Sequence, residues 1–167
     1  MIREVEGDIL HTQAHAIAHG VAPNDFFTHG LSLNLRQRWP AMYQDFLHLN
    51  EKHQPQPGDV FTWRGVGGVQ VVHLFTQDNL EGLSPFTGPA SLDNVKRCMS
   101  KLQQVILEQG IVSLALPRIA TGAGGLEWED VRDIMYPPLE KLHIPTVVYT
   151  DYVPGIAANE RILVYNA

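Results

Sequence analysis

Short apolar segments alternate along this chain with longer segments of helical periodicity. This alternation is typical of an α/β domain, in which helices cover the faces of a sheet. The apolar segments predict strands at 2–5, 14–18, 58–63, 69–75, 111–116 and 146–150, and a terminal edge strand at 161–165. The periodic segments predict helices at 31–38, 41–49, 93–109 and 127–142.

Glycine and proline mark the ends of several of these elements. Pro40 suits the first turn of the second helix, and Gly110 suits the position that follows the third. Pro137 and Pro138 predict that the last helix ends or bends there. A glycine-rich turn at 64–68 joins two strands into a hairpin, and the segments 79–89 and 151–159 are predicted to be loops.

The composition is that of a globular protein. The 167 residues are 44% hydrophobic and 18% charged, which is enough to bury a core, and we expect a single domain over 1–167. The formal net charge of −6 argues against strong non-specific binding to nucleic acid, which needs a basic surface. It does not exclude an anionic ligand held by backbone N–H groups, because these donors carry no formal charge.

The sequence also indicates where the protein works. The N-terminal residues lack the apolar run of a signal peptide, and no stretch approaches the ~18 apolar residues of a membrane span. Cys98 is the single cysteine, so no intramolecular disulfide can form, and we interpret it as a packed thiol. These features predict a cytoplasmic protein without a membrane partner. The lack of a long heptad repeat favours a monomer.

The segment 121–125, Thr-Gly-Ala-Gly-Gly, lies between a predicted buried strand and a predicted helix. In open α/β sheets, ligands bind at the carboxyl ends of the strands. Glycines there let the backbone approach a phosphate, and successive N–H groups and the N-terminus of the following helix then face the anion. The segment is neither a Walker loop nor a dinucleotide-binding motif. By itself it fits a structural turn as well as a phosphate-binding loop.

Other segments accompany this glycine loop in a fixed order. They are Glu6-Gly7-Asp8-Ile9-Leu10, Ala16–Val21 with the loop that runs to Gly30 and the helix after it, Pro117-Arg118-Ile119, and Leu126-Glu127-Trp128. Together they resemble the macrodomain family over about 2–149. The resemblance is strongest to the branch that includes the terminal ADP-ribose glycohydrolase of animals and the bacterial DNA ADP-ribosyl glycohydrolase antitoxins. It implies a three-layer α/β/α fold, a mixed and mostly parallel central sheet, and an ADP-ribose-type ligand.

The resemblance also implies roles for individual residues. Asp8 would accept a hydrogen bond from the adenine amino group, although a turn-capping aspartate is the alternative. Tyr149 would lie near the adenosine, where a core tyrosine is the alternative. The segment 121–125 would bind the diphosphate, and Gln77 would line the distal ribose pocket. The implied ligand-binding residues are Asp8, Ile9, His19, Gly20, Val21, Thr28, Gly30, Leu31, Gln77, Ile119, Ala120, Thr121, Gly122, Ala123, Gly124, Gly125, Leu126 and Tyr149.

The sequence departs from the family pattern at positions that carry chemistry. Gln77 and Gly124 stand where the animal enzyme has a lysine and an aspartate, so a mechanism through a lysine adduct is not expected. Ala22 stands where a functional asparagine or serine is expected in the antitoxin enzymes.

Catalysis, if present, must then use other groups. The polar residues nearest the anomeric carbon would be Asn24, Asp25 and His29. Asp25 would act as a general base on water, and His29 would titrate near neutrality. A solvated loop is an equally good interpretation of these residues.

We therefore predict an ADP-ribose-binding hydrolase that needs no cofactor. It would remove ADP-ribose from modified DNA or protein, or process a free derivative. The alternatives are a non-catalytic ADP-ribose reader and a phosphatase for ADP-ribose 1″-phosphate. His11, His15 and His19 are spaced by four residues, which suits one face of a helix, but the segment 14–18 is predicted to be a strand, so no metal site is expected.

Overall fold

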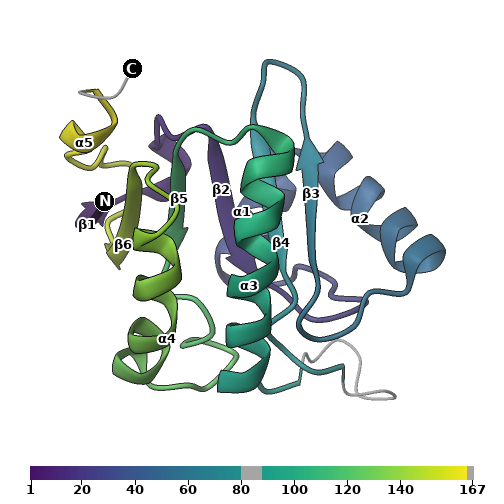
Figure 1. The fold of residues 1–167 in the computed structure, drawn as a ribbon. Helices are drawn as coiled ribbons and strands as arrows, with labels where there is room; N and C mark the ends of the chain where they lie inside the picture. The colour runs from purple at the N-terminus through teal and green to yellow at the C-terminus, as the bar shows by residue number, and fades with distance from the viewer. Residues whose placement is uncertain (80–87, 165–167) are drawn as a thin grey trace.

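The computed structural model describes residues 1–79 and 88–164 of the chain (Figure 1). Six strands form one sheet in the order β1-β6-β5-β2-β4-β3. All neighbouring strands are parallel except β3 and β4, which form the predicted antiparallel hairpin. The strands are β1 (Ile2–Gly7), β2 (Ala16–Gly20), β3 (Val60–Arg64), β4 (Gln70–Leu74), β5 (Leu114–Pro117) and β6 (Thr146–Tyr152).

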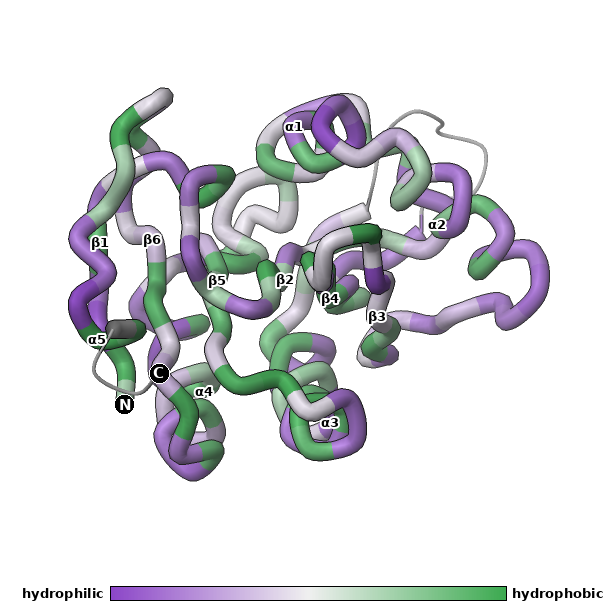
Figure 2. Tube along the Cα trace, turned by 90° about the horizontal axis from the view of Figure 1, so that it is seen from above, coloured by the Kyte–Doolittle hydropathy of each residue, from purple (hydrophilic) through white to green (hydrophobic). Residues whose placement is uncertain are grey.

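Helices cover both faces of this sheet, as the view along its edge in Figure 2 shows. The helices α1 (Gly30–Arg38) and α2 (Pro40–His53) lie on one face, and α3 (Leu92–Gln109) and α4 (Trp128–Glu140) lie on the other. Each face has its own cluster of buried apolar side chains. The predicted three-layer fold with a mixed, mostly parallel sheet is confirmed.

Helix α3 illustrates how the sequence specifies these elements. Its buried positions recur at helical spacing, with Val95, Cys98, Leu102 and Ile106 facing the core. Gly110 ends the helix in the left-handed conformation (φ 63°). Burial raises the pKa of Cys98 to about 12, so the interpretation as a packed thiol is confirmed.

Two central strands begin later than predicted. β2 starts at Ala16 instead of residue 14, and β5 starts at Leu114 instead of residue 111. The start of β2 is set by pairing with its neighbours, because Ala16 lies opposite both Gln70 of β4 and Leu114 of β5. The pairing with β4 continues to Gly20, which is therefore the last residue of β2.

The predicted terminal strand at 161–165 is wrong. Residues Arg161–Val164 form a short helix, α5, and Tyr165 lies outside the described residues. Ile162 and Leu163 both pack against the core cluster beneath α1 and α2, whereas adjacent residues of a strand point to opposite faces. Of the predicted loop 79–89, residues 80–87 also lie outside the described part. No helix among the described residues is long and apolar enough to cross a membrane.

Candidate ligand-binding site

Two adjoining cavities open where parallel strands end. The polar cavity has a volume of about 220 Å³ and the apolar cavity about 260 Å³, and the two share Gly30, Leu31 and Pro117. The polar cavity is lined by His19, Gly20, Asp25, Thr28, His29, Gly30, Leu31, Ser32, Gln77, Pro117, Arg118, Ile119, Ala120, Gly122, Ala123 and Gly124. The apolar cavity is lined by Gly7, Ile9, Gly30, Leu31, Asn34, Pro117, Tyr149 and Tyr152.

The glycine loop forms one wall of the polar cavity. It is closed by two backbone hydrogen bonds, from Gly125 N to Gly122 O (3.1 Å) and from Leu126 N to Ala120 O (3.0 Å). Ala120 adopts positive φ (66°), a conformation that costs free energy in a residue with a Cβ atom. Within 1–79 and 88–164, the amide groups of 119–124 donate no hydrogen bond. These amides are therefore available to an anion in the cavity.

Gly122 and Gly124 have different surroundings in this loop. A Cβ atom on Gly122 would have nothing within 4 Å, so this position faces open space. A Cβ atom on Gly124 would lie 2.6 Å from the carbonyl oxygen of Ala120 and 2.8 Å from the Cβ of Ala90. The aspartate of the animal enzyme therefore cannot be accommodated at position 124 unless the loop moves.

The helix whose N-terminus borders the cavity is α1 and not α4, the helix that follows the glycine loop. Gly30, Leu31 and Ser32, the first three residues of α1, line the polar cavity, whereas none of the described lining residues belongs to α4. The preceding residue, His29, makes no side-chain hydrogen bond to the first turn, and that turn carries no acidic residue. The partial positive charge of α1 thus adds to the anion-binding character of the cavity.

The loop 21–29 also lines the polar cavity and is held by a buried carboxylate. Asp25 is 8% exposed, and its two oxygens accept hydrogen bonds from Ala22 N and Phe27 N, both 3.0 Å long. Burial raises the pKa of Asp25, and the two N–H groups and His29 oppose this shift only in part. Asp25 lines the cavity, and its carboxylate also fixes the shape of the loop.

The three residues predicted for catalysis do not share one cavity. Asp25 and His29 line the polar cavity, but Asn24 lines a neighbouring polar groove that also contains Asn50, Gln54 and Gln56. This amide groove has a volume of about 870 Å³. Asn24 lies in it with positive φ (58°), and its N–H donates to Asn50 Oδ1 (2.7 Å).

The adenine side of the prediction falls near the apolar cavity. Ile9 and Tyr149 line it, and the hydroxyl of Tyr149 donates to Glu160 Oε1 (3.0 Å). The Asp8 carboxylate caps the adjacent turn by accepting from Leu10 N (3.0 Å) and also accepts from Gly155 N (2.9 Å). Asp8 therefore acts as the turn cap that the sequence offered as an alternative, and its contact with adenine stays a prediction.

The remaining predicted ligand residues divide into two groups. His19, Gly20, Thr28 and Gln77 line the polar cavity, and the Gln77 side chain also donates to Gly88 O (3.1 Å). The others support the site without lining either cavity; they are Val21, Thr121, Gly125 and Leu126.

Of the residues that line the cavities, Tyr152 belongs to none of the motifs found in the sequence. Five others belong to the motifs without a predicted role in ligand binding; they are Gly7, Ser32, Asn34, Pro117 and Arg118. Ser32 and Asn34 follow the ligand loop within the first turns of a predicted helix. This position beside the ligand loop is the feature of the sequence that could have indicated their place in the site.

Sequence comparison places this architecture among known proteins. The family described as "Macro domain" matches residues 30–135. The chain belongs to the Macro domain family. The DNA ADP-ribosyl glycohydrolase of Thermus aquaticus is 27% identical over 85% of this chain and 39% of that protein. The enzyme of the same name from Mycobacterium tuberculosis is 25% identical over 89% of this chain and 42% of that protein. This macrodomain thus spans about two fifths of the length of these relatives.

Solved structures agree with this assignment. The macrodomain of Thermus aquaticus DarG has a TM-score of 0.79 and 25% identity, with 90% of this chain and 98% of that chain covered. Thermosipho africanus DarTG, solved in complex with ADP-ribose, has a TM-score of 0.80 and 19% identity, with 97% of this chain and 44% of that chain covered. The chain is therefore a macrodomain related to the DarG ADP-ribosyl glycohydrolases.

Proposed function

We propose that this macrodomain binds ADP-ribose across the two adjoining cavities and hydrolyses its bond to a modified macromolecule. The observation that carries the binding proposal is the continuity of the cavities. An apolar cavity of about 260 Å³ suits an adenosine, and the polar cavity beside it offers backbone N–H groups to a diphosphate. The Thermosipho relative solved with ADP-ribose supports this choice of ligand.

The backbone amides explain how an acidic protein would hold a dianionic ligand. The chain has a formal net charge of −6, so long-range attraction of an anion is absent. The amides of 119–124 and the N-terminus of α1 supply preorganised donors at short range instead. Arg118, which lines the polar cavity, is already paired with Asp151 at 3.2 Å.

For hydrolysis, we assign the general base to Asp25. Asp25 lines the polar cavity, and burial moves its pKa upward toward the range in which a base is effective at neutral pH. Asp25 would take a proton from a water molecule that attacks the anomeric carbon, and His29, an exposed residue that lines the same cavity, would give a proton to the leaving acceptor. The acceptor would extend into the amide groove, which begins one residue away at Asn24.

A non-catalytic ADP-ribose reader is the second candidate, and two observations favour it. Position 124 has no room for an aspartate unless the loop moves, and Gln77 stands where the animal enzyme has its lysine. The protein therefore lacks the groups of that mechanism while it keeps the ligand cavities.

One panel of assays separates the candidates. Calorimetry with ADP-ribose measures binding, and release of ADP-ribose is followed from ADP-ribosylated DNA and ADP-ribosylated protein, with phosphate release from ADP-ribose 1″-phosphate in a third arm. We expect micromolar binding and release from one macromolecular substrate, reduced at least a hundredfold in Asp25→Asn. Binding without turnover in any arm would support the reader, and no binding would reject both candidates.

A further inference from the structure

Two buried histidines face each other beneath the polar cavity. His19 of β2 and His73 of β4 lie opposite each other in the parallel register, and their Nε2 and Nδ1 atoms are 2.7 Å apart. The two residues are 1% and 2% exposed, and both rings contact the ring of Phe27. The hydrogen bond between them is fully enclosed by the core.

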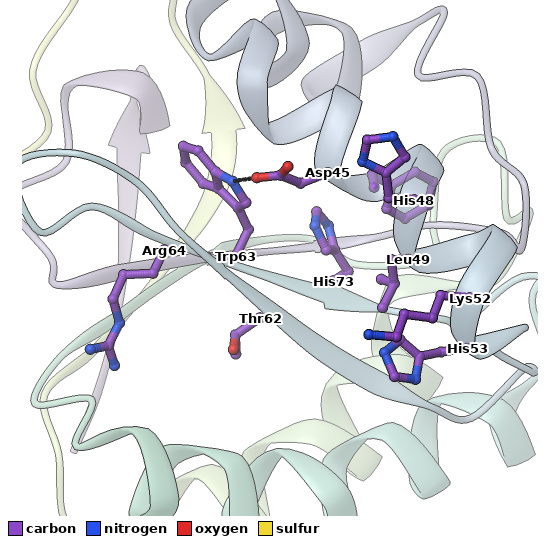
Figure 3. Close-up of a pocket in the computed structure, with 10 residues that line it drawn as sticks. Asp45, His48, Leu49, Lys52, His53, Thr62, Trp63, Arg64 and His73 are labelled. Carbon is purple, nitrogen blue, oxygen red and sulfur yellow. Dashed lines mark hydrogen bonds between the residues drawn. The ribbon is translucent and has the colours of Figure 1, made fainter.

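This pair connects two pockets. On one side, His19 Nδ1 lies 3.0 Å from Ser32 Oγ, and Ser32 lines the polar cavity. On the other side, His73 lines a pocket of about 380 Å³ between α2 and β3 (Figure 3). Its Nε2 atom has no partner among the described residues. A continuous hydrogen-bonded chain, Ser32–His19–His73, therefore runs from the ligand cavity to the α2–β3 pocket.

The spacing allows only two arrangements of protons when both rings are neutral. Burial keeps them neutral, because it lowers the pKa of His73 to about 3 and, together with His73, that of His19 well below its usual value. In one arrangement both rings carry the proton on Nε2, and Ser32 donates its hydroxyl proton to His19. In the other, both rings carry it on Nδ1, and His19 donates to Ser32 Oγ. The Ser32 hydroxyl is then free to donate into the cavity.

A bound ligand favours the second arrangement. In the α2–β3 pocket, His73 Nε2 donates to none of the described residues, so the second arrangement breaks no hydrogen bond there. The Asp45 carboxylate of this pocket accepts from Trp63 Nε1 (2.8 Å; dashed line in Figure 3). In the polar cavity, a ligand with phosphate and ribose oxygens offers acceptors to Ser32.

We propose that His19 and His73 are positioning residues that hold their protons on Nδ1 and so make Ser32 a hydrogen-bond donor to the bound ligand. The proposal rests on the proposed binding of ADP-ribose in the polar cavity. It gives a function to Ser32, which touches the ligand, and to His73, which does not.

Nuclear magnetic resonance of the free protein tests the arrangement directly. Nitrogen-15 correlation spectra of the imidazole rings distinguish Nδ1–H from Nε2–H tautomers, and we expect both His19 and His73 to be Nδ1-protonated. Nε2-protonated rings would overturn the proposal even if the protein binds ADP-ribose. Nδ1-protonated rings in a protein that does not bind ADP-ribose would reject only the proposed function.

A double-mutant cycle tests the link to binding. Ser32→Ala and His73→Phe should each weaken ADP-ribose binding about tenfold, and the double variant should bind no more weakly than Ser32→Ala alone. His73→Phe keeps an aromatic ring against Phe27 and Phe46. Losses that multiply to about a hundredfold would show independent effects and contradict the proposal. If His73→Phe does not fold, His73→Asn, which keeps a group able to donate to His19, should bind within threefold of wild type, and a tenfold loss would contradict it.

Discussion

The two loops that line the polar cavity are stabilised in different ways. The glycine loop is closed by its own backbone hydrogen bonds, and the amides of 119–124 donate no hydrogen bond to the described residues. The loop 21–29 is closed by a side chain, the Asp25 carboxylate, which accepts from the backbone at two places. The glycine loop would therefore recognise the proposed ligand by main-chain geometry, and the loop 21–29 would recognise it by side chains whose positions depend on one buried acid.

The largest effect should come from adding a charge to the exposed part of the glycine loop. Gly122→Glu places a carboxylate in the open space beside the free amides and should weaken ADP-ribose binding at least a hundredfold, about 2.7 kcal/mol, by filling the anion site with a like charge. Calorimetry measures the loss. The matched control Gly122→Gln should lose much less, because it adds a similar volume without charge. Equal affinities for wild type and Gly122→Glu would show that the diphosphate does not lie on this loop.

A substitution in the packed part of the same loop should lower the stability of the protein. Gly124→Ala brings a methyl group to 2.6 Å from Ala120 O and should lower the free energy of unfolding by about 2 kcal/mol through overpacking. Denaturant unfolding measures this change. Gly122→Ala, with no atom within 4 Å of the new Cβ, should change stability by less than ~0.5 kcal/mol. Similar stabilities for the two variants would mean that the loop adapts easily.

In the loop 21–29, the loss of stability caused by a substitution should depend on pH. Asp25→Asn removes one of the two acceptors and should cost about 1 kcal/mol at neutral pH. Because the pKa of Asp25 is raised in the folded state, its contribution to stability is complete below the ordinary value of 3.8 and decreases as pH rises through the folded pKa. The stability difference between wild type and variant should therefore increase as pH falls from neutral toward 4. Unfolding curves across this range measure it, and a difference that shrinks would contradict the raised pKa.

The smallest effect is expected at an exposed side chain of that loop. Thr28 is exposed, and its hydroxyl contacts only His29 Nδ1 (3.1 Å) among the described residues. Thr28→Ala should change the free energy of unfolding by less than ~0.5 kcal/mol. Thermal unfolding measures this change. A larger loss of stability would show that the loop does not depend mainly on Asp25.

Much of the candidate site could be predicted from the sequence. The sequence predicts ligand contacts from the glycine loop, from the loop that ends at Gly30, and from Ile9 and Tyr149. Part of each loop lines the polar cavity, and Ile9 and Tyr149 line the apolar cavity. Asn24 and Asp25 are neighbours in sequence, but they line different cavities because Asn24 has positive φ and turns toward Asn50. No local pattern reveals such a turn in a loop of mixed composition.

The sequence by itself determined the periodicity, the order of the strands and helices, and the membership of a family, because these depend on local spacing of apolar residues and on ordered motifs. Only the tertiary structure decided the register that carries β2 to Gly20, the identity of α1 as the helix that borders the cavity, and the helical end of the chain at Arg161–Val164. It also decided the meeting of His19 with His73, 54 residues apart in sequence. These features depend on contacts between distant segments, whose free energies do not appear in any local window of residues.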